Sequence, residues 1–164
     1  MNVETNGNQA AVLKDSPLTV EMNESEVEAL ARLIRVRDLA DGDVLVPEGS
    51  RDTHLHGVVS GIIEVATRAD GGGWNILHVL RPGDLVGELS FMDGEPRFAA
   101  LIASGPTRVF TLDRSEFESL LNSHPHVVYK AMRAIMRVSH GIQRRLSLQM
   151  REMEHYFLKT GGRY

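Results

Sequence analysis

The chain has 164 residues, of which 42% are hydrophobic, and a formal net charge of −4. This length and composition suffice for one hydrophobic core but not for two domains of ordinary size. Cysteine is absent, which excludes disulfides, iron–sulfur clusters and thiolate zinc sites and favours a cytoplasmic location. There is no long apolar run and no secretory signal at the N-terminus, so we expect no membrane span and no membrane partner.

The charge is unevenly distributed. Residues 1–124 carry 10 Lys and Arg against 20 Asp and Glu, whereas residues 125–164 carry 8 against 2. An acidic body argues against primary DNA binding. We interpret the basic tail as the solvated flank of a helix, with an unidentified acidic protein partner as the alternative. The arginines of this flank are Arg133, Arg137, Arg144, Arg145 and Arg151.

Residues 1–18 are polar and have no apolar period, so we expect a flexible N-terminal arm. A helix is predicted from Asn23 to about Arg35, because Asn23 and Glu26 form a capping-box pattern ahead of apolar residues at helical spacing.

From Val36 to Asp113, short segments rich in Val, Ile and Leu alternate with turns of Gly, Pro and Asp, a pattern typical of an all-β barrel or sandwich. The predicted strands are 36–40, 43–47, 54–59, 62–68, 74–80, 98–103 and 107–112. Asp113 is predicted to cap a short helix that ends before Pro125. The expected fold class is therefore mainly β with flanking helices.

Residues 125–158 are predicted to form one long helix, followed by a short tail over 159–164. Two sets of positions along this helix each recur every seven residues. Taken together, the two sets alternate at the four-then-three spacing of a coiled coil. The first seam is Val128, Ile135, Ile142, Gln149 and Tyr156, and the second is Met132, Ser139, Leu146 and Met153. We predict a parallel homodimer through this helix. The alternative is that the residues of these seams pack on the chain's own β-barrel.

The segment over 80–103 indicates a binding site. Gly87 opens a predicted helical turn whose free backbone N–H groups would face an anion. The turn over 93–96 then brings the chain back to Arg97, which supplies a guanidinium. A phosphate diester fits better than a triphosphate, because there is no lysine-bearing glycine loop and no carboxylate cluster for magnesium. The alternative is a structural ion pair between Glu88 and Arg97.

The stretches Gly87-Glu88-Leu89-Ser90 and Pro96-Arg97-Phe98-Ala99-Ala100 resemble the phosphate-binding cassette of the cyclic-nucleotide-binding domain family. The likeness covers about residues 20–150 and includes Glu48-Gly49 and Asp52. The family includes the sensor domains of catabolite activator proteins and the regulatory subunits of cyclic-AMP-dependent protein kinase. The resemblance implies a jelly-roll-like β-roll, a double-stranded β-helix, over 19–124. It also implies a lid and dimerisation helix over 125–158.

The resemblance further implies roles for individual residues. Glu88 would accept a hydrogen bond from the ribose 2′-hydroxyl, and Arg97 would pair with the exocyclic phosphate oxygens. The backbone N–H groups of Leu89, Ser90, Phe98 and Ala99 would complete the phosphate contacts. Ile142 and Gln143 stand where the catabolite activator has a hydroxyl pair over the adenine, which implies a more apolar base lid.

Phe98 departs from the family pattern, which usually has a small residue after the cassette arginine. Members that prefer cyclic GMP often have a threonine there, so the resemblance favours cyclic AMP over cyclic GMP as ligand. The alternative is that the Phe98 ring fills the pocket and leaves a degenerate domain that acts as a structural dimer. A third reading is a fragment of a larger regulator.

We expect neither an enzyme nor a cofactor, because no nucleophile, base and orienting group occur in a recognisable arrangement. His54 and His56 share one face of a predicted strand, and we interpret them as ordinary strand residues rather than metal ligands. His78, beside the pocket, is a minor haem candidate. We expect no autonomous DNA binding, because the family's transcription factors carry a helix-turn-helix domain after the long helix and this chain stops at Tyr164.

Overall fold

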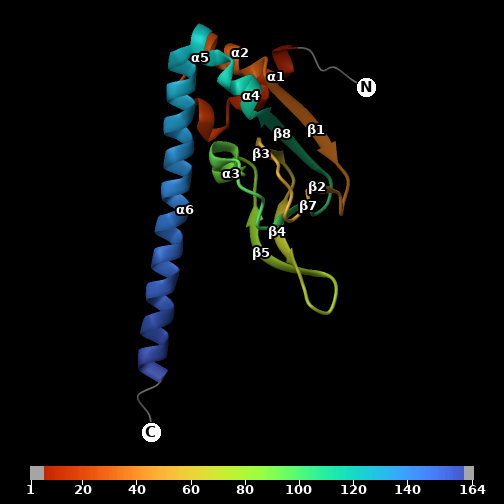
Figure 1. The fold of residues 1–164 in the computed structure, drawn as a ribbon, viewed down its shortest axis with the longest axis vertical. Coiled ribbons are helices and arrows are strands. Elements are labelled where there is room, and N and C mark those ends of the chain that lie inside the picture. The colour runs from red at the N-terminus through yellow and green to blue at the C-terminus, as the bar shows by residue number, and fades with distance from the viewer. Residues whose placement is uncertain (1–5, 161–164) are drawn as a thin grey trace.

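The computed structural model describes residues 6–160 of the chain. Its strands form two antiparallel four-stranded sheets, in the orders β1-β8-β3-β6 and β2-β7-β4-β5 (Figure 1). The strands are β1 (Ile34–Leu39), β2 (Val44–Val46), β3 (His54–Ser60), β4 (Ile63–Arg68), β5 (Trp74–Leu80), β6 (Leu85–Val86), β7 (Ala100–Ala103) and β8 (Thr107–Asp113). The helices are α1 (Asn6–Leu13), the 3-10 helix η1 (Pro17–Thr19), α2 (Glu24–Ala31), α3 (Glu88–Asp93), α4 (Arg114–Glu118), α5 (Leu120–Ser123) and α6 (Pro125–Thr160).

The predicted β-roll is confirmed, and each of the seven predicted strands is present. Buried residues that alternate along the strands fill the space between the two sheets, as period-two burial requires. They include Leu39, Val58, Ile63, Val65, Leu101 and Val109. The sequence pattern missed β6, because its two residues are too few to show a period. β6 pairs with His56 and Gly57 of β3.

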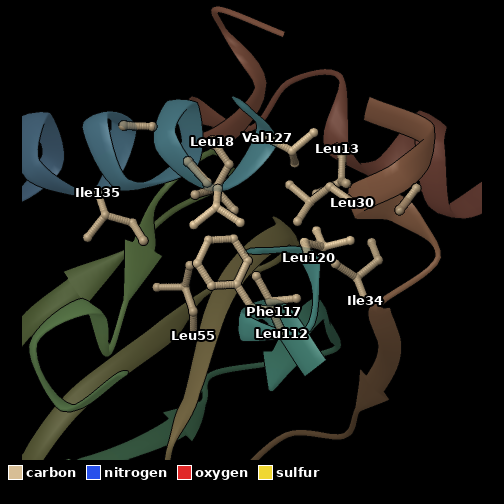
Figure 2. Packing of buried hydrophobic residues seen from close by; sticks show 14 of the residues in the cluster. Leu13, Leu18, Leu30, Ile34, Leu55, Leu112, Phe117, Leu120, Val127 and Ile135 are labelled. Carbon is tan, nitrogen blue, oxygen red and sulfur yellow. The ribbon is translucent and has the colours of Figure 1, made fainter. Parts of the chain in front are cut away.

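A second core lies where the helices cover one end of the roll. Figure 2 shows Leu13, Leu30 and Val127 from three helices meeting Leu55 and Leu112 from two strands. Phe91 of α3 also belongs to this core, and its ring centroid lies 5.5 Å from that of Phe117 in α4. The helix that opens the candidate cassette is therefore packed directly against the helical end of the molecule.

The expectation of a flexible arm over residues 1–18 is wrong for the part that the structure describes. Leu13 and Leu18 are 0% and 1% exposed, within α1 and η1. The Ser16 hydroxyl caps η1, and the Thr19 hydroxyl donates to the Leu13 carbonyl oxygen at 2.6 Å. The two leucines are joined by a turn, so they show no helical period. Residues 1–5 lie outside the described residues.

Replacement of Leu18 by alanine is therefore expected to lower the free energy of unfolding by about 2–5 kcal/mol, because it leaves a cavity in a closed core. Urea unfolding followed by circular dichroism measures this change. Val20→Ala is the matched control, because Val20 is 75% exposed and its truncation should cost no more than about 0.5 kcal/mol. Equal stability of Leu18→Ala and the native chain would show that the N-terminal segment is not part of the fold.

The predicted long helix is present as α6, and its two halves differ. In the first half, Val127, Val128, Ala131, Ala134 and Ile135 are buried in the helical core. The prediction that Val128 and Ile135 line a dimer seam is therefore wrong, because both side chains pack on the chain's own body. From Gln143 to Lys159 every side chain is exposed, and Figure 1 shows this half extending away from the roll.

Part of the basic flank is paired inside the chain. Arg133 and Arg137 lie 3.2 and 3.1 Å from the Glu21 carboxylate. Lys130 lies 2.6 Å from Glu26, the residue that completes the capping box of α2. These contacts join the first half of α6 to α2 and to the turn that precedes it. Among the described residues, no helix combines the length and the apolarity needed to cross a bilayer.

Candidate functional site

The cassette begins where α3 meets a buried arginine. Gly87 is the N-cap of α3 and has a φ of 86°, in the left-handed region that favours glycine. A Cβ on Gly87 would lie 2.0 Å from Nη1 of Arg97. The backbone of the first turn therefore approaches the guanidinium as closely as only glycine allows.

Arg97 is held by the segment that leads into β3. Its side chain is 6% exposed, and its Nη2 donates to Asp52 Oδ2 at 2.7 Å and to the His54 carbonyl oxygen. Its backbone N–H donates to the Ser50 carbonyl oxygen at 2.9 Å, and its carbonyl oxygen accepts from Gly49 at 2.7 Å. The alternative of a structural ion pair between Glu88 and Arg97 is wrong, because the carboxylate paired with Arg97 is Asp52.

The guanidinium has a buried N–H group that no described residue pairs with. Arg97 Nε is buried and has no hydrogen-bond partner among the residues that the structure describes. A buried unpaired donor costs about 1–3 kcal/mol, and more when the group is charged. Such a donor beside a close backbone turn is suited to an acceptor that comes from outside the protein, and an anionic oxygen fits it best.

Asp52 accepts from two histidines as well as from Arg97. His54 Nδ1 lies 2.6 Å from Oδ1, and His56 Nε2 lies 2.8 Å from Oδ2. Burial of the carboxylate acts to raise its pKa and is the largest single influence. The hydrogen bonds to the two histidines and Arg97 together outweigh burial, so the pKa of Asp52 lies well below the ordinary aspartate value. A full negative charge is therefore held beside Arg97.

His56 is a neutral partner of this carboxylate. The residue is 3% exposed, and its burial lowers its pKa despite the hydrogen bond to Asp52. The contact with a carboxylate oxygen requires that Nε2 carry the proton. The other ring nitrogen, Nδ1, is buried without a partner in the described part of the chain, which suits the unprotonated state of a neutral ring.

The remaining cassette residues differ in how far their side chains are buried. Glu88, Ser90 and Ala99 are 9%, 8% and 4% exposed, whereas Leu89 is 63% exposed. Glu88 is the first residue of α3 and directly follows Gly87. The structure thus gathers the predicted glycine, carboxylate and arginine at one end of α3. Their contacts with a ligand stay predictions.

The degenerate alternative requires the Phe98 side chain to fill the pocket, and the structure shows that it does not. It is 76% exposed, whereas its neighbours Arg97 and Ala99 are buried. Phe98 lies in a bend just before β7, and its ring is turned outward while Arg97 and Ala99 are turned inward. The pocket-filling role is therefore wrong.

The two residues of the predicted base lid lie midway along α6. Ile142 is half-buried and Gln143 is exposed. Both lie where α6 leaves the body of the protein. Their role over a base stays a prediction.

Sequence reasoning did not assign His54 and His56 to the site, although it placed them on one strand face. The available signal was the alternation of Asp52, His54 and His56, which puts three polar side chains on one face at the start of β3. His54 Nε2 also lies 3.6 Å from Oδ2 of Asp113, the residue that caps α4. Within the described range these side chains make no group suited to a metal ion.

The structure is a β-roll in which a buried arginine lies beside a helical turn that begins at a glycine. The sequence matches the family described as the cyclic nucleotide-binding domain over residues 36–124, which is more than half of the chain. The protein therefore belongs to the cyclic nucleotide-binding domain family.

Individual relatives agree with this assignment. The chain is 27% identical over 113 residues to a CRP-like cAMP-activated global transcriptional regulator of Mycobacterium tuberculosis, covering 69% of this chain and 50% of the regulator. It is 29% identical over 128 residues to a cAMP-dependent protein kinase regulatory subunit of Mycosarcoma maydis, covering 73% of this chain and 24% of the subunit. The chain thus spans half or less of the length of these two proteins.

A solved structure shows the same architecture. The N-terminal domain of a transcriptional regulator from Streptomyces coelicolor A3(2) superposes with a TM-score of 0.69 at 29% sequence identity. The match covers 80% of this chain and 94% of that domain. The β-roll and its flanking helices are therefore shared with a regulator's N-terminal domain.

Proposed function

We propose that this protein is a sensor that binds cyclic AMP in preference to cyclic GMP and relays binding through α6. The main support for this proposal is the buried Arg97, whose Nε–H lacks an acceptor among the described residues and whose Nη1 lies against Gly87. A cyclic nucleotide supplies one singly charged phosphate diester, which matches one guanidinium and a few backbone N–H groups. In this proposal Glu88 accepts from the ribose hydroxyl.

The preference for cyclic AMP rests on two supports. The residue after Arg97 is Phe98, which has no hydroxyl to offer a guanine. Two relatives in the same family are named for activation by, or dependence on, cyclic AMP. The proposed role is regulatory rather than catalytic.

Isothermal titration with cyclic AMP and then cyclic GMP tests the proposal, after unfolding and refolding to remove any ligand carried through purification. Micromolar binding of cyclic AMP, equivalent to about −8 kcal/mol, and weaker binding of cyclic GMP are expected. Phe98→Ala should change the affinity little, because the ring points outward. Absence of binding to both nucleotides by the native chain would contradict the sensor function. Binding that appears only in Phe98→Ala would restore the degenerate alternative.

The proposed relay runs through α3. Phe91 of α3 is 0% exposed and lies in the same core as Val127 and Ile135 of α6. A ligand that draws the first turn of α3 toward Arg97 would move Phe91 and change the packing beneath α6. Such coupling requires that the nucleotide bind one position of α6 more tightly than another.

The proposed output is a dimer through the second half of α6. The exposed large apolar residues there are Leu146, Leu148, Met150, Met153, Tyr156, Phe157 and Leu158, each between 50% and 79% exposed. Leu146 and Met153 belong to the second predicted seam and Tyr156 to the first, and all three are exposed here. Most helical stability in proteins comes from packing of an apolar face, so a second copy of the same helix would stabilise this exposed half.

We expect the native chain to sediment as a dimer at tens of micromolar. The double variant Leu146→Glu and Met153→Glu should sediment as a monomer, because two charges would then face each other across the seam. The control variant Ser147→Glu and His155→Glu places the same charges outside the seam and should stay dimeric. A native chain that is monomeric with and without nucleotide would contradict the dimer.

A further inference from the structure

One carboxylate in the site is surrounded by more donors than an ion pair with Arg97 needs. Asp52 Oδ2 accepts from Arg97 Nη2 at 2.7 Å and from His56 Nε2 at 2.8 Å. Asp52 Oδ1 accepts from His54 Nδ1 at 2.6 Å and from the His54 backbone N–H at 3.3 Å. We refer to Asp52, His54, His56 and Arg97 as the Asp52 cluster. Both oxygens of the carboxylate are thus occupied.

The donors in the Asp52 cluster restrict how the carboxylate turns. An aspartate paired with arginine alone keeps a choice of rotamers about its two side-chain torsions. His56 lies behind the pair, with a side chain only 4% exposed, and shares the oxygen that Arg97 uses. This oxygen and the His54 carbonyl oxygen together determine where Nη2 lies. Because the guanidinium is planar and rigid, the position of Nη2 also determines where the unpaired Nε–H points.

The neutral state of His56 is part of this arrangement. A cationic imidazole would compete with Arg97 for the same carboxylate oxygen and would add positive charge next to the guanidinium. A neutral ring donates one hydrogen bond to Asp52 and leaves its charge to Arg97. Burial lowers the pKa of His56, which keeps the ring in this state.

We propose that His56 is a positioning residue for nucleotide binding, which acts through Asp52 to hold Arg97 with its Nε–H free for the ligand phosphate. The proposal rests on the proposed function and adds a residue that does not itself touch the ligand. The proposed role requires one neutral N–H donor at the position of His56 Nε2.

Two substitutions separate the donor from the bulk of the side chain. His56→Gln keeps an amide N–H at about the reach of Nε2, whereas His56→Leu fills the space without a donor. Titration with cyclic AMP is expected to show about tenfold weaker binding for His56→Leu and near-native binding for His56→Gln. His140→Leu removes an exposed histidine of α6 and should leave the affinity unchanged. If His56→Leu does not fold, His56→Asn replaces it, because its shorter amide does not reach Asp52.

A double-mutant cycle tests whether His56 acts through Asp52. In the background of Asp52→Asn, the substitution His56→Leu should change cyclic AMP affinity much less than in the native chain, because the carboxylate that it positions is gone. Urea unfolding of each variant reports stability separately from affinity. Native affinity of His56→Leu, equal losses in the Leu and Gln variants, or full additivity with Asp52→Asn would each overturn the proposal. If the native chain binds neither nucleotide while remaining folded, the proposed function itself fails and this inference falls with it.

Discussion

Arg97→Ala is expected to weaken cyclic AMP binding by about tenfold to a hundredfold, because a charge-assisted hydrogen bond contributes about 1.5–3 kcal/mol. The substitution removes the buried guanidinium whose Nε–H is unpaired in the described structure. It also leaves Asp52 as a negative charge beside the proposed phosphate position, which opposes an anionic ligand. Isothermal titration of native and substituted chains measures the change directly.

Two further variants sharpen this experiment. Arg97→Lys keeps the charge but offers no rigid fork, so it cannot hold Asp52 and face the ligand at once, and its affinity should also fall. Arg35→Ala removes an arginine that is 66% exposed and paired with Glu116 at the surface, so it should leave the affinity unchanged. Native affinity in Arg97→Ala would refute the assignment of the phosphate site.

Gly87→Ala is expected to abolish detectable cyclic AMP binding while the chain still folds. The added methyl group would lie 2.0 Å from Arg97 Nη1, so the guanidinium or the first turn of α3 must move. The φ of 86° also costs a non-glycine residue about 1–2 kcal/mol. Titration measures the loss of binding, and urea unfolding measures the strain.

Gly42→Ala is the matched control for this substitution. Gly42 has a φ of 81°, but nothing lies within 4 Å of a Cβ built on it. Gly42→Ala should therefore lose only the stability that its φ costs, and only Gly87→Ala should lose affinity. Equal affinities in the two variants would show that the close approach at Gly87 has no part in ligand binding.

Local signals predicted the elements that depend on neighbouring residues. Asn23 Oδ1 accepts from the Glu26 backbone N–H at 3.0 Å, and Glu26 Oε2 accepts from the Asn23 backbone N–H at 2.9 Å, so the predicted capping box is confirmed. Asp113 caps α4 as predicted. Caps, turns and strand periods involve residues a few positions apart, so short stretches of sequence contain the whole interaction.

The candidate site was predicted only in part. The motif around Gly87 and the arginine at 97 pointed to a phosphate cassette, and the family resemblance is confirmed. The carboxylate that holds Arg97 lies 45 residues away in sequence, and no local pattern states that Asp52 rather than Glu88 is its partner. Such a pairing depends on how β3 and the cassette pack together.

The sequence by itself determined the strands, the capped helices and the long helix, because period and caps act over short distances; the β-roll came from the family resemblance. Only the tertiary structure decided four matters: the partner of Arg97, the outward direction of Phe98, the burial of Leu13 and Leu18, and the point where α6 leaves the body. Each depends on which distant surfaces meet. A side chain's burial and partners follow from that packing rather than from its neighbours along the chain.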